Sequence, residues 1–387
     1  MADKFLILAI NPGSASTKFA LYEDTVAVFA ANIRHTSEEL APFRGTPILD
    51  QLAFRRQRIE EELRSRNYDP DFSKLMVFPP DGPPRSIASA LSAVVGRGGL
   101  LRPLASGTYR VNTEMLDELR RAERGEHASN LGAFLADTLG NQAQAPAFIV
   151  DPVSVDEWTD KARLSGSALL DRECLSHALN SKAVAKRFAR EKGLAYDHMH
   201  LIVAHIGSGI SVSAHERGRM VDVTNSREEG AFSTERAGTV PCMKLVDLCF
   251  SGKYTRDQIE TLLFREGGLY SYLGTKDLEE IESRIAAGDQ RAALVYETMV
   301  YQIAKEIGAM SAALRGRVDA ILITGGMAHS KKLVANLRSH IYWIAPLQVL
   351  PGEDELQALV EGALRVLRGE EPAHEFGTRP VHEVTGP

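Results

Sequence analysis

Short unbroken runs of apolar residues occur near the start of the chain, separated by polar loops that contain glycine. Residues 5–10 (FLILAI) form one such run, which predicts a buried strand ending at the Asn11-Pro12 pair. After the polar loop NPGSASTK, apolar positions resume over residues 19–33 and predict two more strands joined at Glu23-Asp24. The pattern therefore predicts a β-meander.

The same arrangement recurs about half-way along the chain. Residues 201–206 (LIVAHI) are apolar, and the polar loop GSG and strand patterns at 210–216 and 220–223 follow them. Asn11 and His205 begin the two matching loops. The recurrence predicts two similar domains built on one strand, loop, strand plan.

Helical spacing of apolar residues predicts several helices. Thr46 and Pro47 fit the N-cap and the first residue of a helix that continues to Leu63. Other helices are expected in three segments: near residues 129–139, over 291–314 with Gly316 as its C-cap, and over 355–367.

Further short runs predict strands that end at residues suited to chemistry. Residues 147–150 lead to Asp151-Pro152, and residues 320–324 lead to Gly325-Gly326. Residues 87–95 are expected to lead to a glycine-rich turn that contains Arg97. Because ligands of open α/β sheets bind outside the carboxyl ends of strands, these ends are candidate sites.

Composition narrows the class of protein. The chain has 387 residues, 44% hydrophobic and 25% charged, which fits two ordinary globular domains. A net charge of −6 without a basic stripe disfavours a nucleic-acid partner. The three cysteines lack the spacing of a structural zinc site, and the apolar opening is too short to span a membrane. We therefore expect a cytoplasmic protein without a nucleic-acid or membrane partner.

Three glycine-containing loops at strand ends are candidates for phosphate binding. In NPGSASTK, backbone N–H groups, hydroxyls and Lys18 can hold an anion, although an ordinary polar hairpin explains the same residues taken alone. It is not a Walker A loop. The GSG loop after His205 and the Gly325-Gly326 turn repeat the pattern, and together the three loops favour a nucleotide.

Asp151 and two arginines are further candidates. The position of Asp151 at a strand end is typical of a carboxylate that holds Mg²⁺ beside bound phosphates. An Asp-Pro turn without a metal explains the same residue equally well. Arg97 and Arg236 can pair with phosphate or carboxylate, although each is explained singly as a surface residue. The histidines lack zinc-binding spacing, and no GxSxG or SxxK pattern surrounds Ser14 or Ser16, which disfavours hydrolase chemistry.

Taken in order, these segments resemble the acetate and butyrate kinase family, part of the sugar kinase, actin and heat-shock chaperone superfamily. The resemblance covers nearly all of residues 5–368 and rests on the motifs INPGSASTK, HASNLGA, FIVDPVS, ALNSKAVAKRFA, VAHIGSGISV, EEGAFSTERAGTVP, ITGGMAHS and PGEDELQALVEGAL. Within the family, the butyrate kinase subgroup is the most similar. The resemblance implies Mg²⁺-dependent, reversible transfer between ATP and a short-chain carboxylate, giving ADP and an acyl phosphate.

The fold implied by the resemblance is α/β, with two duplicated ribonuclease-H-like domains (actin-like ATPase fold). Each domain would hold a mixed five-stranded sheet, and the two would meet at an interdomain cleft. We expect an N-terminal domain over residues 1–151 plus 353–370, a nucleotide-binding domain over 152–352 and a loose tail over 371–387. A homodimer or higher homo-oligomer is also implied.

The resemblance implies roles for individual residues. The expected catalytic residues are Arg236, Asp151, Arg97 and His177, and the expected metal-associated residues are Asn11, Asp151 and Glu355. The nucleotide, including its transferred phosphoryl group, would be bound by Asn11, Gly13, Ser14, Ser16, Thr17, Lys18, His205, Gly207, Ser208, Gly209, Gly325 and Gly326.

Two departures distinguish this chain from acetate kinases. Val94 stands where their HRVVHGG motif has arginine, so that Arg97 is a neighbouring source of the guanidinium. Ser181 stands where they keep a histidine, and His177 matches a neighbouring one. These differences favour butyrate or a branched short-chain acid as substrate. The alternatives are an acetate or propionate kinase and a non-catalytic nucleotide-binding protein of the same superfamily.

Overall fold

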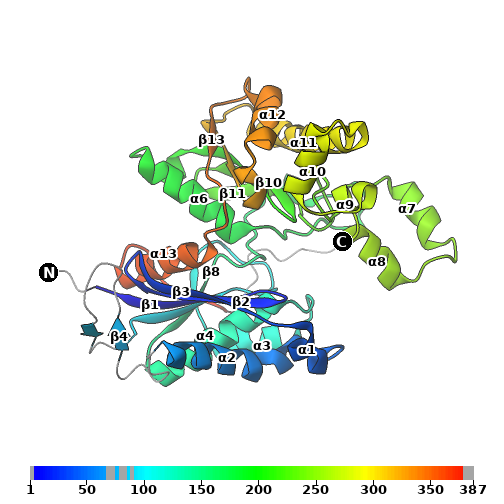
Figure 1. The fold of residues 1–387 in the computed structure, drawn as a ribbon. Helices are drawn as coiled ribbons and strands as arrows, with labels where there is room; N and C mark the ends of the chain where they lie inside the picture. The colour runs from blue at the N-terminus through cyan, green and yellow to red at the C-terminus, as the bar shows by residue number, and fades with distance from the viewer. Residues whose placement is uncertain (1–3, 67–74, 78–84, 88–90, 378–387) are drawn as a thin grey trace. The chain divides into compact units, whose positions relative to one another are not determined.

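The computed structural model describes residues 4–66, 75–77, 85–87 and 91–377 (Figure 1). The chain divides into two compact units: unit 1 comprises residues 1–156 and 354–387, and unit 2 comprises residues 157–353. These divisions lie within a few residues of the boundaries expected from the sequence, at 151 and 353.

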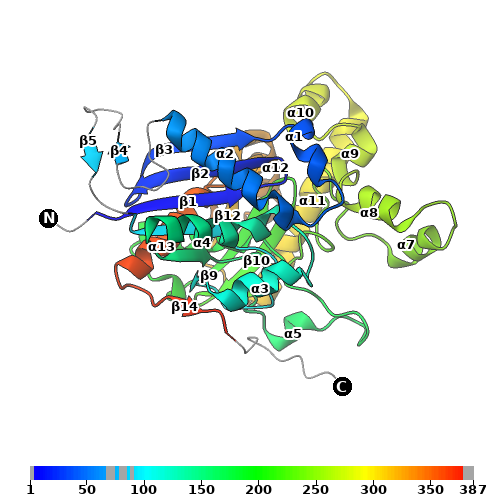
Figure 2. The same ribbon diagram turned by 90° about the horizontal axis from the view of Figure 1, so that it is seen from below.

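Unit 1 is built on a seven-stranded mixed sheet with the strand order β14-β7-β8-β6-β1-β2-β3. Its central strands are almost wholly apolar, and they are buried because helices cover both faces of the sheet (Figures 1 and 2). The strands are β1 (Leu6–Pro12), β2 (Ser16–Glu23), β3 (Val26–Arg34), β6 (Ala93–Arg97), β7 (Thr108–Arg110), β8 (Ala147–Val150) and β14 (His374–Glu375). The predicted meander and the strand at 147–150 are thus confirmed.

The sheet of unit 1 has two strands more than the five expected. β7 pairs antiparallel with β8, and β14 pairs parallel with β7, which extends one edge of the sheet. The prediction of a loose tail from residue 371 is wrong for this part, because β14 is paired and Phe376 is buried beside Tyr109 in the core. Residues 378–387 of that predicted tail lie outside the described residues.

Helices α2 and α4 cover one face of this sheet and α13 covers the other (Figure 2). The helix predicted from Thr46 begins later, since a 3₁₀ turn at Ile48–Gln51 follows Pro47 and α2 begins at Leu52. The other elements of unit 1 are α1 (Ser37–Leu40), α2 (Leu52–Ser65), α3 (Thr113–Arg121), α4 (Leu131–Ala143), α13 (Glu355–Leu367), 3₁₀ turns at Ala41–Phe43 and Ala128–Asn130, and the paired strands β4 (Leu75–Val77) and β5 (Arg85–Ile87). Part of the stretch predicted at 87–95, residues 88–90, lies outside the described residues.

Unit 2 is built on a five-stranded mixed sheet with the order β11-β10-β9-β12-β13. Helix α6 packs on one face, and α11 and α12 pack on the other. The strands are β9 (His200–Ile206), β10 (Ile210–Glu216), β11 (Arg219–Val223), β12 (Ala320–Thr324) and β13 (Leu347–Val349). The helices are α5 (Asp160–Arg163), α6 (Ala178–Glu191), α7 (Cys242–Cys249), α8 (Arg256–Phe264), α9 (Gly268–Leu273), α10 (Leu278–Ala286), α11 (Gln290–Ala313) and α12 (Lys331–Ile341), with 3₁₀ turns at Tyr196–His198 and Gly326–His329.

The two sheets share one pairing scheme. In unit 1, β1 is antiparallel to β2 and parallel to β6, while β2 is antiparallel to β3 and β6 is parallel to β8. In unit 2, β9, β10, β11, β12 and β13 repeat these relations in the same order. The duplication predicted from the Asn11 and His205 loops is therefore present in the topology. In the described part of the chain, no helix is both long and apolar enough to cross a membrane.

Candidate active site

Three predicted site residues of unit 1 lie at the carboxyl ends of neighbouring strands. Asn11 is near the end of β1, Arg97 ends β6, and Asp151 follows β8. The strands are parallel and in register, with Ile10 opposite Gly96 and Arg97 opposite Val150. The topology therefore brings these residues to one edge of the sheet, where α/β proteins bind ligands.

Asn11, Arg97 and Glu355 form a hydrogen-bonded cluster at this edge. Nη1 of Arg97 lies 3.0 Å from Oε1 of Glu355 and donates to its Oε2 at 3.2 Å. The amide nitrogen of Asn11 donates to the same carboxylate, and the amide oxygen of Asn11 lies 3.4 Å from Nη1 of Arg97. Glu355 is the first residue of α13, so the helix start, β1 and β6 are joined by side chains. The structure thus brings together three of the predicted site residues.

Close backbone packing fixes the turn that carries Arg97. A Cβ on Gly96 would stand 2.1 Å from the carbonyl oxygen of Gly132, and one on Gly99 would stand 2.5 Å from Oδ1 of Asn130. That same oxygen accepts the N–H of Leu100 at 2.9 Å. The HASNLGA motif therefore supports the Arg97 turn. Val94 is fully buried in the core of unit 1, whereas the guanidinium of Arg97 reaches Glu355 at this edge.

Asp151 is buried, and its backbone has a positive φ of 37°, which is uncommon for a residue other than glycine. Its Oδ1 accepts hydrogen bonds from the Ser106 hydroxyl at 2.6 Å and from the Gly107 N–H at 2.7 Å. Strained backbone that holds a carboxylate at a strand end is frequent at functional sites. The carboxylate is therefore held in one orientation by the loop before β7.

The 13–18 loop presents some of its predicted residues and buries another. Ser14 and Lys18 are exposed, and Gly13 and Ser16 are half-buried. The side chain of Thr17 is fully buried, and its hydroxyl lies 2.8 Å from Nε2 of His35. The Thr17 side chain therefore packs inward under the loop, and the nucleotide contact predicted for Thr17 stays a prediction.

In unit 2, two predicted histidines stack on each other. His205 is the penultimate residue of β9 and His177 precedes α6, and their rings are 3.8 Å apart and almost parallel. Nδ1 of His205 is hydrogen bonded to Oδ1 of Asn180 at 3.0 Å, and its Nε2 lies 3.0 Å from Oε1 of Glu353. Nδ1 of His177 is hydrogen bonded to the Ser211 hydroxyl at 2.9 Å. Both rings are thus held by neighbouring polar groups.

The structure also brings Arg236 to the loop of residues 205–209. A Cβ on Gly209 would stand 2.5 Å from Nη1 of Arg236, so only glycine leaves room for the guanidinium at this point. Nη1 donates to the carbonyl oxygen of Ser226 at 2.9 Å and to its hydroxyl at 3.3 Å. Burial lowers the pKa of Arg236, yet arginine stays protonated at neutral pH. A fixed positive charge therefore lies beside a glycine-containing loop.

The two glycines after β12 differ in their surroundings. Gly325 has φ 91°, and a Cβ there would stand 2.4 Å from the carbonyl oxygen of Ile206. Gly325 also exchanges backbone hydrogen bonds with Gly352. No described atom lies within 4 Å of a Cβ built on Gly326, which is exposed. Gly325 is thus required by the backbone, whereas Gly326 leaves open space at the strand end.

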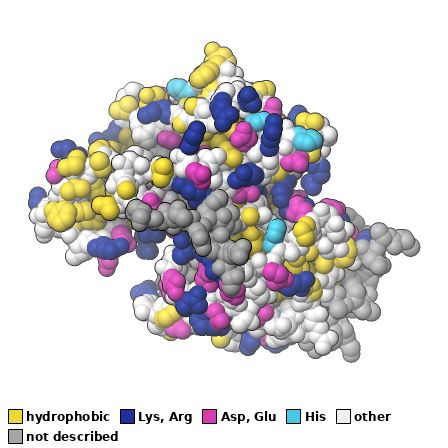
Figure 3. Space-filling model, turned by 180° about the vertical axis from the view of Figure 1, so that it is seen from behind, with side chains coloured by type: hydrophobic (Ala, Val, Ile, Leu, Met, Phe, Trp, Pro, Cys, Tyr) yellow, Lys and Arg dark blue, Asp and Glu magenta, His cyan; other side chains and the backbone are white. Residues whose placement is uncertain are grey.

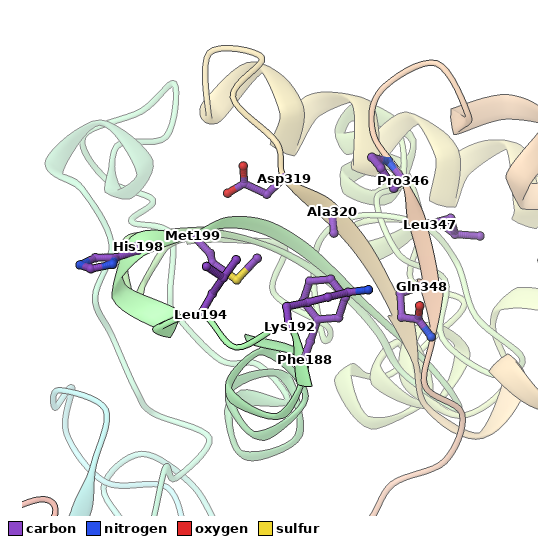
Figure 4. Close-up of a pocket in the computed structure, with 10 residues that line it drawn as sticks. All are labelled: Phe188, Lys192, Leu194, His198, Met199, Asp319, Ala320, Pro346, Leu347 and Gln348. Carbon is purple, nitrogen blue, oxygen red and sulfur yellow. The ribbon is translucent and has the colours of Figure 1, made fainter. Parts of the chain in front are cut away.

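A cavity of about 520 Å³ in unit 2 contains none of the predicted site residues (Figure 4). It lies where β9, β12 and β13 begin, with apolar Phe188, Met199 and Leu347 and polar Lys192 and Gln348 in its lining. His205 and Gly325 lie at the other ends of the same strands. The candidate site is therefore defined by the strand ends and not by this cavity.

Several site residues were missed by reasoning from the sequence. Asn180 and Glu353 contact His205, Ser226 holds Arg236, and Ser106 anchors Asp151. Asn180 and Glu353 lie inside the motifs ALNSKAVAKRFA and PGEDELQALVEGAL. These motifs carry the family resemblance, but they indicate no role for either residue. Ser106 and Ser226 lie in loops where the sequence offers no such signal.

Comparisons with known proteins show the family to which this chain belongs. The chain is 46% identical to a protein of Clostridium botulinum (strain Alaska E43 / Type E3) named "Probable butyrate kinase", over 95% of this chain and 99% of that protein. Residues 172–345 match the model of the acetokinase family. The chain belongs to the acetokinase family. The protein is therefore a kinase with a carboxyl group as acceptor, and it uses ATP and ADP.

Solved structures show that other acetokinases share this fold. The structure matches the acetate kinase of Porphyromonas gingivalis with a TM-score of 0.71 and 18% identity, covering 93% of this chain and 99% of that one. A propionate kinase from Francisella tularensis gives a TM-score of 0.69 and 16% identity, covering 92% of this chain and 98% of that one. The predicted α/β fold of duplicated, actin-like domains is thus confirmed.

The contrast between Gly325 and Gly326 gives a prediction with a built-in control. Gly326→Ala should leave the free energy of unfolding unchanged, because the new methyl group meets no atom of the described residues. If the nucleotide lies against this turn, the added methyl group overpacks the contact and weakens the free energy of ATP binding by ~1 to 3 kcal/mol. The KM for ATP then rises about tenfold. Gly325→Ala should instead destabilise the fold. Urea unfolding and steady-state kinetics check both; an unchanged KM for Gly326→Ala would remove Gly326 from the nucleotide site.

Proposed function

We propose that this acetokinase is a butyrate kinase, which transfers the γ-phosphoryl group of ATP reversibly to butyrate or a branched short-chain acid. The products are ADP and an acyl phosphate, formed by direct in-line transfer. One observation carries the proposal: each unit places an arginine at the carboxyl ends of its strands. In unit 1, Arg97 pairs with the carboxylate of Glu355, and in unit 2, Arg236 lies beside the loop that contains Gly209. Similarity to the clostridial relative favours butyrate.

This chemistry needs no protein nucleophile or general base. A short-chain carboxylic acid is ionised at neutral pH, so its oxygen attacks the γ-phosphorus while the bond from that phosphorus to the bridging oxygen of ADP breaks. The main barrier is repulsion between two anions. We propose that Arg97, Arg236 and the N–H groups of the loops offset the charge on the phosphoryl oxygens, and that His177 and His205 hold the loop geometry.

Mg²⁺ belongs to the proposal as well. No three His, Cys, Asp or Glu side chains gather as a metal cluster in the described ranges, but Mg²⁺ keeps several waters and takes only one or two carboxylates in kinases. Asp151 fits such a role, because its hydrogen bonds from Ser106 and Gly107 both use Oδ1. Asn11 and Glu355 supply further oxygens at this edge. When bound, Mg²⁺ neutralises charge on the phosphates.

A hydroxamate assay tests the function directly. The purified chain is incubated with ATP, Mg²⁺, hydroxylamine and one acid at a time from acetate, propionate, butyrate, isobutyrate and isovalerate. We expect acyl hydroxamate to form fastest with acids of four or five carbons, although one methylene changes discrimination by only ~1 to 3 kcal/mol. Preference for acetate or propionate would contradict the butyrate assignment. Absence of product with every acid would favour a non-catalytic nucleotide-binding protein.

We also propose that the enzyme is a cytoplasmic homodimer or higher homo-oligomer. Helices α7 and α8 project from the rest of unit 2, and hydrophobic side chains gather on this part of the surface (Figure 3). Phe250 is 87% exposed and Met243 is 66% exposed, while α7 buries no residue. A second copy of the chain would cover this apolar surface. Sedimentation velocity tests the assembly, and a monomer at assay concentration would contradict it.

A further inference from the structure

Arg55 on α2 is a fully buried arginine without an acidic partner. Its exposed fraction is 0%, and in the described part of the chain its guanidinium bonds to neutral oxygen atoms. Burial lowers its pKa to about 10, so the group remains charged at neutral pH. Removing a cation from water without a counter-charge costs several kcal/mol. Such a residue therefore needs a compensating set of contacts.

Those contacts are made to the 13–18 loop. Nη1 of Arg55 donates to the carbonyl oxygens of Gly13 at 2.8 Å and Ser16 at 2.9 Å. Nη2 donates to the carbonyl oxygen of Ser14 at 3.2 Å. Oε1 of Gln51 accepts from Nε at 3.0 Å and from Nη2 at 2.9 Å, which fixes the plane of the guanidinium. One side chain thus ties three carbonyl groups of a single tight turn.

A second layer of contacts fixes the base of the loop. Nη1 of Arg55 also donates to the Thr17 hydroxyl at 3.1 Å, and that hydroxyl is hydrogen bonded to His35 at 2.8 Å. Burial, and then the charge of Arg55, lower the pKa of His35 to about 4. The ring is therefore neutral at pH 7 and adds no second charge. Arg55 is therefore the buried cation of this layer.

The peptide geometry links these contacts to anion binding. A carbonyl group and the following N–H share one planar peptide unit and point in opposite directions. Because the carbonyl groups of Gly13 and Ser14 point toward Arg55, the N–H groups of Ser14 and Ala15 point away from it. Both residues are exposed, and in the described part of the chain these two N–H groups have no backbone acceptor. Successive N–H groups that point outward form an anion-binding nest.

We propose that Arg55 is a positioning residue that holds the 13–18 loop with its N–H groups directed at the transferred phosphoryl group. Its buried charge adds to the positive potential of the loop. An arginine suits this role because its planar fork reaches three carbonyl oxygens, whereas lysine offers one point charge. The inference rests on the proposed function, because it assumes that this loop binds the γ-phosphoryl group of ATP or the phosphoryl group of the acyl phosphate.

The test compares binding of ATP and ADP to the full chain by titration calorimetry with Mg²⁺ present. Arg55→Met should raise the Kd of ATP at least 30-fold and change the Kd of ADP less than threefold, because ADP lacks the phosphoryl group that the loop contacts. Arg55→Lys should show a loss of about tenfold for ATP. The KM for acyl phosphate should rise in parallel. Arg56→Met, on the same helix and paired with Glu60 at the surface, is the matched control.

Each outcome decides the inference. A loss selective for ATP supports it, whereas equal losses of ATP and ADP, or none, overturn it. If Arg55→Met does not fold, Arg55→Lys and Gln51→Met give the same comparison, since Gln51 orients the guanidinium. Failure of the proposed function gives a different result, because the wild-type chain would then bind both nucleotides but form no acyl hydroxamate. The effect of Arg55 on ATP binding would still be measurable in that case.

Discussion

Replacement of Arg236 by alanine is expected to lower kcat about 1000-fold and to leave the fold intact. The guanidinium lies against Gly209 in the loop after His205, where it can offset charge on the phosphoryl oxygens. A 1000-fold loss corresponds to ~4 kcal/mol of transition-state stabilisation. The KM for ATP should change much less, because charge spreads over the phosphoryl oxygens only as the transition state forms. Steady-state kinetics in both directions measure the effect.

Arg227→Ala is the control for this experiment. Arg227 is an exposed arginine of the same segment, and its guanidinium lies 4.8 Å from the centre of the Phe264 ring. It should retain the wild-type kcat. Arg236→Lys should regain little activity, because an ammonium group cannot reproduce the planar fork. Stability should change little, because the guanidinium bonds only to Ser226 in the contacts described. A kcat within tenfold of wild type for Arg236→Ala would falsify the assignment.

The parts of the fold that the sequence predicted well have strong, local burial patterns. The strand at 147–150, the strand at 320–324 and the helix at 355–367 were found at the predicted residues. The two strands are unbroken apolar runs that are buried in their sheets, and the helix places its apolar residues on a face that packs against its own unit. By contrast, β7 and β14 have three and two residues, too few to show a period, and their pairing depends on distant partners.

Site residues that belong to loops at strand ends were predicted from the sequence. Residues that contact these loops from other parts of the chain were missed. Arg97 and Asn11 were predicted, but their contact with Glu355 joins residues far apart in the chain. Arg55 lies in a charged helix, where an arginine is typical of a solvated face. Only the structure shows that its side chain turns inward. The same burial explains why Thr17, with a hydroxyl suited to phosphate, packs under the loop.

Replacement of Asp151 by asparagine should lower kcat about 100-fold and raise the Mg²⁺ concentration for half-maximal rate at least tenfold. Loss of a metal-orienting group typically costs 10- to 100-fold in metal affinity or activity. Asparagine keeps an oxygen for Ser106 and Gly107 and tolerates the positive φ of this position. The substitution therefore removes the charge and little else. Initial rates over a Mg²⁺ titration, with ATP and butyrate saturating, measure both quantities.

Asp156→Asn provides the comparison, because Asp156 is also a buried carboxylate of this segment but lies farther along the chain from the end of β8 than Asp151 does. It should keep the wild-type Mg²⁺ dependence. Asp151→Ala should lose stability as well as activity, since alanine removes the anchor of the loop before β7 and sits poorly at positive φ. If Asp151→Asn keeps both its kcat and its Mg²⁺ dependence, the carboxylate serves only the Asp-Pro turn, because the asparagine oxygen preserves the hydrogen bonds that hold that turn.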